Sequence, residues 1–163
     1  MSIGDGHHFR SATDANISQK IVMAASVPPL ASLYLTANKN TFMNESRDAA
    51  IEAWPNYFSK KLVVTQNGET MDYEGFLKQM KEAKTNWPII DVRYKLLTAS
   101  GRSVASAEYV WIPSEKIWFD TIIVMTFGDV GTEDENKVVT FLEIMQPGPA
   151  SRDPTAPEFQ SIA

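Results

Sequence analysis

Apolar side chains follow a helical period in the first half of the chain and a strand period in the second half, and this change is the main guide to the fold. The clearest helical segment is DYEGFLKQMKEAK, residues 72–84, whose apolar positions recur at the spacing of one helix face: Tyr73, Phe76, Leu77 and Met80. Asp72 is placed to cap the first turn, and Trp87-Pro88 ends the pattern. A helix over residues 72–84 is therefore predicted.

Helical signals also precede this segment, from about residue 17 to residue 58. A helix is expected over RDAAIEAW, with either Asn44 or Ser46 as its N-cap. Pro55 lacks a backbone N–H, so it must either kink this helix or begin a new one.

The remaining segments predict strands. The run LVVTQ, residues 62–66, precedes the turn signal Asn67-Gly68. After Pro88, four long strands separated by turn residues are expected: 89–99, 102–112, 117–127 and 137–145. Helices followed by consecutive antiparallel strands indicate an α+β fold. Because the strands are about ten residues long, against a usual five or six, we expect a cone-shaped, strongly curved antiparallel sheet packed on the N-terminal helices.

One domain accounts for this order of elements. Residues 1–14 are polar and predict a flexible N-terminal arm, and residues 15–146 form the α+β domain. Residues 147–163 contain four prolines and few apolar residues, which indicates an extended or disordered tail.

Charge and composition exclude several classes of function. The net charge is −5, and no basic cluster longer than Lys60-Lys61 occurs, which argues against nucleic acid and anionic membranes as partners. The chain has no cysteine, so disulfides and thiolate chemistry are excluded. Its two histidines, His7 and His8, lie in the polar arm, which makes a Ser–His triad or a histidine metal site improbable. We expect no metal and no cofactor.

The apolar run IVMAASVPPLASLYL, residues 21–35, is the only stretch that resembles a membrane segment. It is broken by Pro28-Pro29 and falls short of the roughly 20 residues that span a bilayer. A buried helical segment with a proline break is the preferred interpretation. The first sixteen residues carry no signal-peptide pattern, so a cytoplasmic location is expected.

One carboxylate interrupts the apolar face of the last strand. In KVVTFLEIM, period-two alternation places Glu143 on the same face as Val139, Phe141 and Met145. If this face points inward, the carboxyl lies in apolar surroundings and is a candidate general acid or base. If the face points outward, Glu143 is solvated or lies in a subunit contact, and the apolar residues Leu142 and Ile144 on the other face keep that alternative open.

Two further residues are candidates for the same chemistry. Asp120 interrupts WFDTIIVM and shares a face with Trp118, so it could pair with Glu143, or it could form a local bulge or turn bond. Tyr109 shares a face with Trp111 and several alanines, which suits a cavity wall and a hydrogen bond to a substrate carbonyl. A tyrosine packed in the core is the alternative.

The order of helix, short strand, helix and four long strands resembles the superfamily of nuclear-transport-factor-two-like (NTF2-like) and SnoaL-like proteins. The segment LVVTQNGETMDYEGFLKQM is similar to the strand, turn and helix of that group, and IIVMTFGDVGTEDENKVVTFLEIM is similar to its closing hairpin. The resemblance covers roughly residues 45–146 and is most similar to fungal natural-product isomerases and cyclases that use no cofactor.

The resemblance implies a cone-shaped pocket between the helices and the sheet. It implies an arginine on an early helix and a glutamate on the last strand, positions that Arg47 and Glu143 could occupy. An arginine on the surface of a helix is the alternative for Arg47. Where bacterial cyclases and steroid isomerases place an aspartate on the third long strand, this chain has Ile122-Ile123, so their chemistry is not expected. Predicted substrate contacts are aromatic or sulfur-containing side chains: Trp54, Tyr57, Phe58, Tyr73, Met80, Trp111, Trp118 and Phe141. For the first five, packing in the core is the alternative.

The function that the resemblance implies is a cofactor-independent isomerase or cyclase of natural-product biosynthesis that acts on a hydrophobic intermediate. Glu143, with Asp120, would move a proton, and Tyr109 or Arg47 would stabilise negative charge. A dehydratase, a non-catalytic small-molecule-binding module and a dimerising module of the same fold are the alternatives. A homodimer through the open sheet face is expected under each hypothesis.

Overall fold

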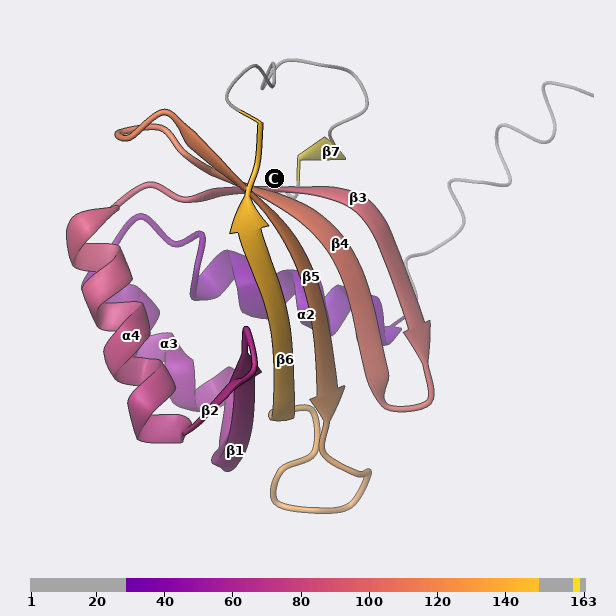
Figure 1. The fold of residues 1–163 in the computed structure, drawn as a ribbon. Coiled ribbons are helices and arrows are strands. Elements are labelled where there is room, and N and C mark those ends of the chain that lie inside the picture. The colour runs from indigo at the N-terminus through magenta and orange to yellow at the C-terminus, as the bar shows by residue number, and fades with distance from the viewer. Residues whose placement is uncertain (1–28, 150–159, 162–163) are drawn as a thin grey trace, which may run out of the picture.

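The computed structural model describes residues 29–149 and residues 160–161 (Figure 1). The predicted arm over residues 1–14 with its two histidines lies outside the described residues, as does most of the predicted tail. Within the described tail, Gln160–Ser161 forms a short strand, β7, that pairs with Arg93 and Tyr94.

Three helices carry the first part of the fold: α2 (Pro29–Asn40), α3 (Arg47–Tyr57) and α4 (Tyr73–Asn86). The two caps act as the sequence indicates, because Ser46 accepts a hydrogen bond from the backbone N–H of Ala49 and Asp72 accepts one from Gly75. Pro55 lies inside α3, and the helix ends two residues later at Tyr57.

Six further strands join β7 in one sheet, in the order β2-β1-β6-β5-β4-β3-β7. Their bounds are β1 (Phe58–Gln66), β2 (Glu69–Asp72), β3 (Asp91–Ser100), β4 (Ser103–Ile112), β5 (Ile117–Phe127) and β6 (Val138–Pro147). The four predicted long strands are confirmed to within about two residues, and consecutive ones pair antiparallel. Asn67 and Gly68 both have positive φ, 49° and 88°, as the two-residue turn between β1 and β2 requires.

The sheet is mixed: the four predicted long strands pair antiparallel, and one further pair of strands is parallel. β1 runs parallel to β6, with Val64 opposite Phe141 and Gln66 opposite Glu143. A parallel pair needs a long crossover connection, and here α4 and four strands supply it. The pairing places residues from the first and last long strands side by side.

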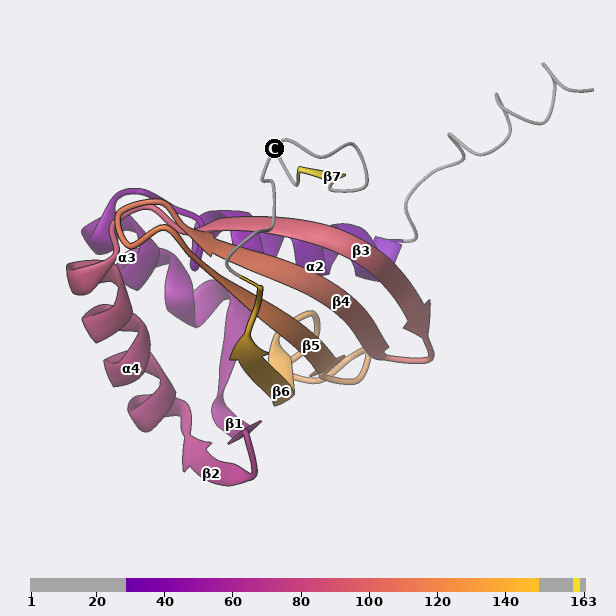
Figure 2. The ribbon, with the colours of Figure 1, turned by 45° about the horizontal axis from the view of Figure 1, so that its top comes forward.

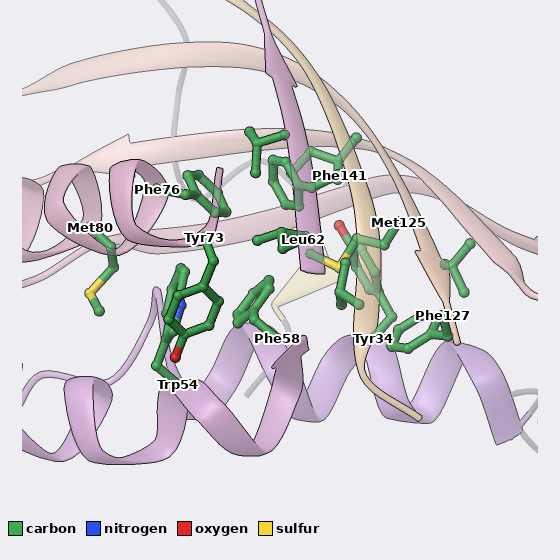
Figure 3. Close-up of a cluster of buried hydrophobic side chains, with 14 of the residues drawn as sticks. Tyr34, Trp54, Phe58, Leu62, Tyr73, Phe76, Met80, Met125, Phe127 and Phe141 are labelled. Atoms are coloured by element: carbon green, nitrogen blue, oxygen red, sulfur yellow. The ribbon is translucent and has the colours of Figure 1, made fainter. Parts of the chain in front are cut away.

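The helices lie on the concave side of the curved sheet (Figures 1 and 2). Between them lies an aromatic core in which Trp54 of α3 stacks on Phe58 of β1 with ring centroids 4.0 Å apart (Figure 3). Phe76 of α4 lies 4.8 Å from Phe141 of β6 by the same measure. All four rings are almost completely buried, so large aromatic groups tie the helices to the sheet.

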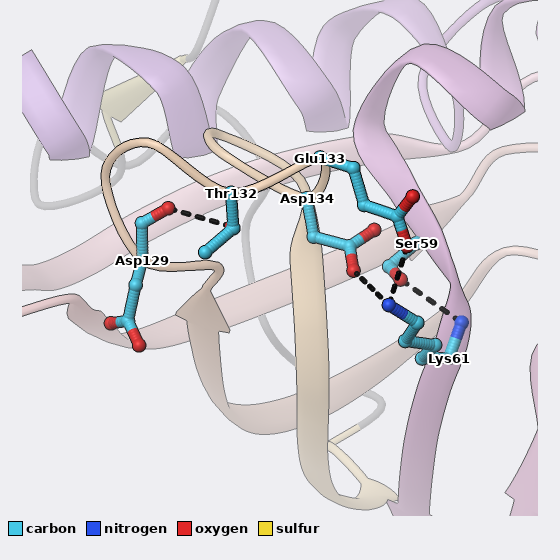
Figure 4. Close-up of polar contacts among 6 residues, drawn as sticks. All are labelled: Ser59, Lys61, Asp129, Thr132, Glu133 and Asp134. Atoms are coloured by element: carbon cyan, nitrogen blue, oxygen red, sulfur yellow. Dashed lines mark hydrogen bonds and ion pairs between the residues drawn. The ribbon is translucent and has the colours of Figure 1, made fainter.

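The acidic loop between β5 and β6 is tied to the start of β1. Lys61 contacts Glu133 at 2.5 Å and Asp134 at 3.4 Å, and its backbone N–H donates to the Ser59 hydroxyl (Figure 4). A Cβ at Gly128 would lie 2.2 Å from the backbone oxygen of Asp134. Only glycine therefore permits this close return of the loop.

The convex face of the sheet carries a row of apolar side chains across four neighbouring strands. Leu96 lies opposite Ala107, Ala107 opposite Ile122, and Ile122 opposite Ile144. Leu96, Ile122 and Ile144 are each more than half exposed. The homodimer expected through this face stays a prediction. Among the described helices, none has the length and apolar character needed to cross a membrane.

Candidate active site

A pocket of about 380 Å³ lies between α4 and the concave face of the sheet. Its wall is formed by Phe42 from the α2–α3 connection, by α4 and the residues after it, and by inward-facing side chains of β3, β4, β5 and β6. Most lining side chains are apolar, and the aromatic ones are Phe42, Phe76, Trp87, Phe119 and Phe141. The pocket is large enough for a small apolar molecule.

Two carboxyl groups are buried in this wall. Glu143 on β6 is 9% exposed and Glu108 on β4 is 3% exposed. The other polar lining residues are Gln66, Gln79, Glu82 and Asn86. The pocket therefore combines an apolar interior with two acids that are shielded from water.

Glu143 is held by a chain of amides. Gln79 of α4 donates from Nε2 to Oε1 of Gln66 over 2.5 Å, and Gln66 donates from Nε2 to Oε2 of Glu143 over 2.5 Å. Burial raises the pKa of Glu143, while the hydrogen bond from Gln66 lowers it. Because an amide N–H donates best to a charged oxygen, the bond from Gln66 offsets part of the effect of burial, and the pKa of Glu143 stays above its ordinary value.

Glu108 is held by hydroxyls. Tyr34 of α2 and Ser106 both donate to Oε1 of Glu108, and the two hydroxyl oxygens lie 2.6 Å apart. The pKa of Glu108 is raised to about 7, because burial and, to a smaller extent, the charge of Glu143 outweigh the lowering effect of the two hydroxyl bonds. Glu108 can therefore hold or release a proton near neutral pH.

The two acids lie two strands apart on one face. Glu108 pairs with Thr121 of β5, and Glu143 pairs with Ile123 of the same strand. Strand spacing and rise then separate their backbones by roughly 12 Å, with both side chains directed into the pocket. One can give a proton to a bound molecule while the other takes a proton from it at a different atom.

Asp120 and Tyr109 lie on the opposite face, so their predicted places in the pocket are corrected. Asp120 is opposite Tyr109 in the sheet register, and both are one residue out of phase with the pocket-lining positions of their strands. Asp120 therefore does not pair with Glu143. Of the neighbours Glu108 and Tyr109, it is Glu108 that faces the pocket.

Arg47 is also placed away from the pocket. It is the first residue of α3, its side chain is 47% exposed, and it contacts Asp48 at 3.4 Å. This position does not allow it to bind a substrate oxygen in the pocket.

The predicted substrate contacts divide into three groups. Met80 and Phe141 line the pocket. Trp54, Phe58 and Tyr73 are buried in the core instead.

The other predicted contacts lie elsewhere. The Tyr57 hydroxyl accepts a hydrogen bond from Asn40. Trp111 and Trp118 stack on each other at 4.7 Å on the convex face.

Only one of the adjacent residues Glu108 and Tyr109 can face the pocket, and the sequence interpretation chose Tyr109 over Glu108. It missed Tyr34 and Gln66. A signal for Glu108 was present, because it alternates with Val104, Ser106, Val110 and Ile112 on a face that is mostly apolar. No local signal marks Tyr34 or Gln66, since each acts through a partner more than 70 positions away. In the described part of the chain, no group of acidic residues could hold a metal ion.

Comparison with known proteins identifies the fold. No family model matches the chain, and no curated protein matches it. Solved structures do: a SnoaL-like polyketide cyclase from Agrobacterium tumefaciens has a TM-score of 0.54 at 10% identity, over 74% of this chain and 93% of that one.

Two solved structures of proteins of unknown function are also similar to this chain. A SnoaL-like protein from Burkholderia thailandensis has a TM-score of 0.54 at 14% identity over 76% and 98% of the two chains. An NTF2-like protein from Cytophaga hutchinsonii has a TM-score of 0.52 at 8% identity over 75% and 94%. The chain thus has the SnoaL-like, NTF2-like α+β fold, as the sequence resemblance indicated.

Proposed function

We propose that this protein is a cofactor-independent isomerase or cyclase that moves protons on a hydrophobic small molecule in the pocket. The observation that carries the proposal is the pair of buried carboxyls, Glu143 and Glu108, in one apolar cavity with different hydrogen-bond partners. The SnoaL-like neighbours include a polyketide cyclase, which supports an enzymatic role in natural-product biosynthesis.

The two acids have different roles in this proposal. Gln66 favours the carboxylate form of Glu143, so Glu143 is the general base. Glu108 keeps a proton up to about pH 7 and is the general acid. A reaction in which one proton enters and another leaves gives an isomer or a cyclised product of the same composition.

The base can be tested without knowing the substrate. The probe is 5-nitrobenzisoxazole, a small neutral molecule whose ring opens when a base removes one C–H proton. We expect ring opening faster than with free acetate, and a loss of about tenfold or more in Glu143→Gln, because the amide cannot accept the proton.

Glu115→Gln, in the exposed turn between β4 and β5, is the matched control because Glu115 does not line the pocket. It should keep most of the rate. If Glu143→Gln opens the ring as fast as the unchanged protein, Glu143 is not the base and the proposal fails.

A further inference from the structure

The charges that line the pocket all have one sign. Three carboxyl groups line it, those of Glu82, Glu108 and Glu143, and no lysine, arginine or histidine is among the described lining residues. The nearest buried cation is Lys84, whose Nζ donates to the backbone oxygens of Phe42 and Pro88 and does not line the pocket. Among the described residues, a bound molecule therefore meets acids and no basic side chain.

Aromatic rings form much of the rest of the wall. Phe42, Phe76 and Phe141 contact one another, with centroid distances of 5.8 Å, 6.3 Å and 4.8 Å. Trp87 and Phe119 line other parts of the pocket. Aromatic faces attract cations, by about 0.5–2 kcal/mol per contact, and carboxylates add a stronger attraction where water is excluded.

A negatively charged ligand would be repelled by the carboxyl groups of this pocket. An enolate or a carboxylate in this pocket would lie among three acids with only amides and a protonated Glu108 to stabilise it. The cost of burying an unpaired charge is large. The wall of the pocket is thus suited to a positively charged ligand and not to a negatively charged one.

We propose that the pocket stabilises positive charge on a bound apolar molecule, so that the substrate is a neutral compound that becomes a cation when it is protonated. This inference rests on the proposed function for the direction of proton transfer. The substrate class is an apolar molecule with a basic alkene, epoxide or allylic oxygen, and not an acid or a phosphate-bearing thioester.

The proton transfers balance without a further reactant. Glu108 gives its proton to the substrate and becomes a carboxylate, and the substrate becomes a cation. After the bonding electrons shift within the substrate, the Glu143 carboxylate takes a proton from a carbon next to the cationic centre, and the C–H electrons form a double bond. The product has the composition of the substrate, and exchange with solvent returns one proton to Glu108 and removes one from Glu143.

Equilibrium binding of three matched probes tests the sign of charge. The probes share one naphthalene ring and differ in their charge: 2-naphthylmethylamine as its ammonium ion, 2-naphthylmethanol and 2-naphthoate. By isothermal titration at about pH 8, where Glu108 has lost its proton, we expect the ammonium ion to bind about tenfold or more tightly than the alcohol. The carboxylate should bind most weakly.

The pH dependence adds a second readout. Raising the pH from about 6 to about 8 ionises Glu108, so ammonium affinity should rise while alcohol affinity stays level or falls. The titratable groups that act on Glu108 are Tyr34 from α2, Tyr94 from β3 and Glu143 from β6. The pKa values of both tyrosines are raised above their ordinary value, chiefly by burial, so neither ionises in this range.

Two variants test which residues produce the preference for the ammonium ion and its rise with pH. Phe141→Leu keeps an apolar side chain and should weaken ammonium binding more than alcohol binding, and Glu108→Gln should remove the rise with pH. Glu115→Gln, in the exposed turn between β4 and β5, is the control and should change neither.

The outcomes separate this inference from the proposed function. If the alcohol binds as tightly as the ammonium ion at about pH 8, the inference on charge is overturned while proton transfer on a neutral molecule stands. If none of the probes binds, the inference is overturned as well. If the ammonium ion is preferred but Glu143→Gln leaves the benzisoxazole rate unchanged, the proposed function fails and the charge preference of the pocket remains.

Discussion

Tyr34 and Glu108 lie 74 positions apart in the sequence, and their side chains meet in a hydrogen bond inside the protein. The bond joins helix α2 to strand β4 at the wall of the pocket. Burial, with the charge of Glu108 adding to it, raises the pKa of Tyr34 well above its ordinary value. The phenol therefore stays protonated and remains a hydrogen-bond donor to Glu108.

Removing this donor should shift the titration of Glu108. In Tyr34→Phe the carboxylate loses one of its two hydroxyl donors, so the pKa of Glu108 should rise further above about 7. The measurement is a pH titration of the glutamate side-chain carbons by NMR in protein labelled with ¹³C-glutamate.

Tyr94→Phe is the control for that experiment. It removes a second tyrosine hydroxyl, whose ring lies 6.3 Å from that of Tyr34 and which is not among the hydrogen-bond donors to Glu108. Tyr94→Phe should change the pKa of Glu108 less than Tyr34→Phe does. A pKa of Glu108 that falls in Tyr34→Phe would contradict the assigned role of the phenol.

Stability should fall as the pH rises through the pKa of Glu108. The folded state holds a proton on Glu108 up to about pH 7, whereas the unfolded chain releases it near 4.5. The folded state therefore binds more protons between these values, and the free energy of unfolding should decrease over this window by about 3 kcal/mol at most. The contribution is fully present below the unfolded pKa and is lost above the folded one.

Urea unfolding at a series of pH values measures this dependence. The raised pKa of Glu143 should likewise lower the free energy of unfolding as the pH rises. Glu108→Gln should flatten the curve between about pH 5 and about pH 7. A stability that instead increases over this window in the unchanged protein would show that Glu108 is ionised when folded.

The amide of Gln66 should set the pKa of Glu143. In Gln66→Leu the carboxylate loses its donor while the surroundings stay apolar, so the pKa of Glu143 should rise and the benzisoxazole rate should reach its plateau at higher pH. Gln79→Ala should give a weaker shift in the same direction, because Gln79 only orients Gln66. Equal pH–rate profiles in all three proteins would remove Gln66 from the site.

Lys84 should stabilise the edge of the pocket. Its side chain is 2% exposed, and its Nζ donates to the oxygens of Phe42 and Pro88 over 3.2 Å and 2.7 Å. Lys84→Met keeps the length of the chain but leaves both carbonyl groups without this donor, so we expect a loss of about 1–3 kcal/mol in the free energy of unfolding.

Lys78→Met on the exposed side of α4 is the control for Lys84→Met. Its Nζ lies 4.0 Å from Glu82 and its side chain is 79% exposed, so its effect should stay within about 0.5 kcal/mol. Urea unfolding monitored by tryptophan fluorescence compares the two variants. A change in Lys84→Met no larger than in Lys78→Met would mean that water replaces the amine at no cost.

Most of the elements could be predicted because their signals are local. Period-two alternation located the four long strands, and Asp72 and Ser46 cap helices through bonds that span three residues. The parallel pairing of β1 with β6 could not be predicted, since it joins segments about 75 positions apart, and no local pattern encodes parallel pairing at that distance.

The candidate site could be predicted only in part. Alternation gives two faces for each strand but does not say which face is concave, and both faces of β4 and β5 carry apolar residues. Asp120 and Tyr109 were therefore placed on the wrong side. Glu143 does face the pocket, because its neighbours Phe141 and Met145 point the same way.

The parallel contact between β1 and β6 also has a consequence for synthesis on the ribosome. Gln66 leaves the exit tunnel long before Glu143 does, so the carboxyl group and its amide donor cannot meet until the last long strand has been made. A nascent chain that stops short of Met145 would expose the aromatic groove with no strand to close it. Such fragments should be clients for chaperones and proteases, and the pocket would form only once β6 has joined the sheet.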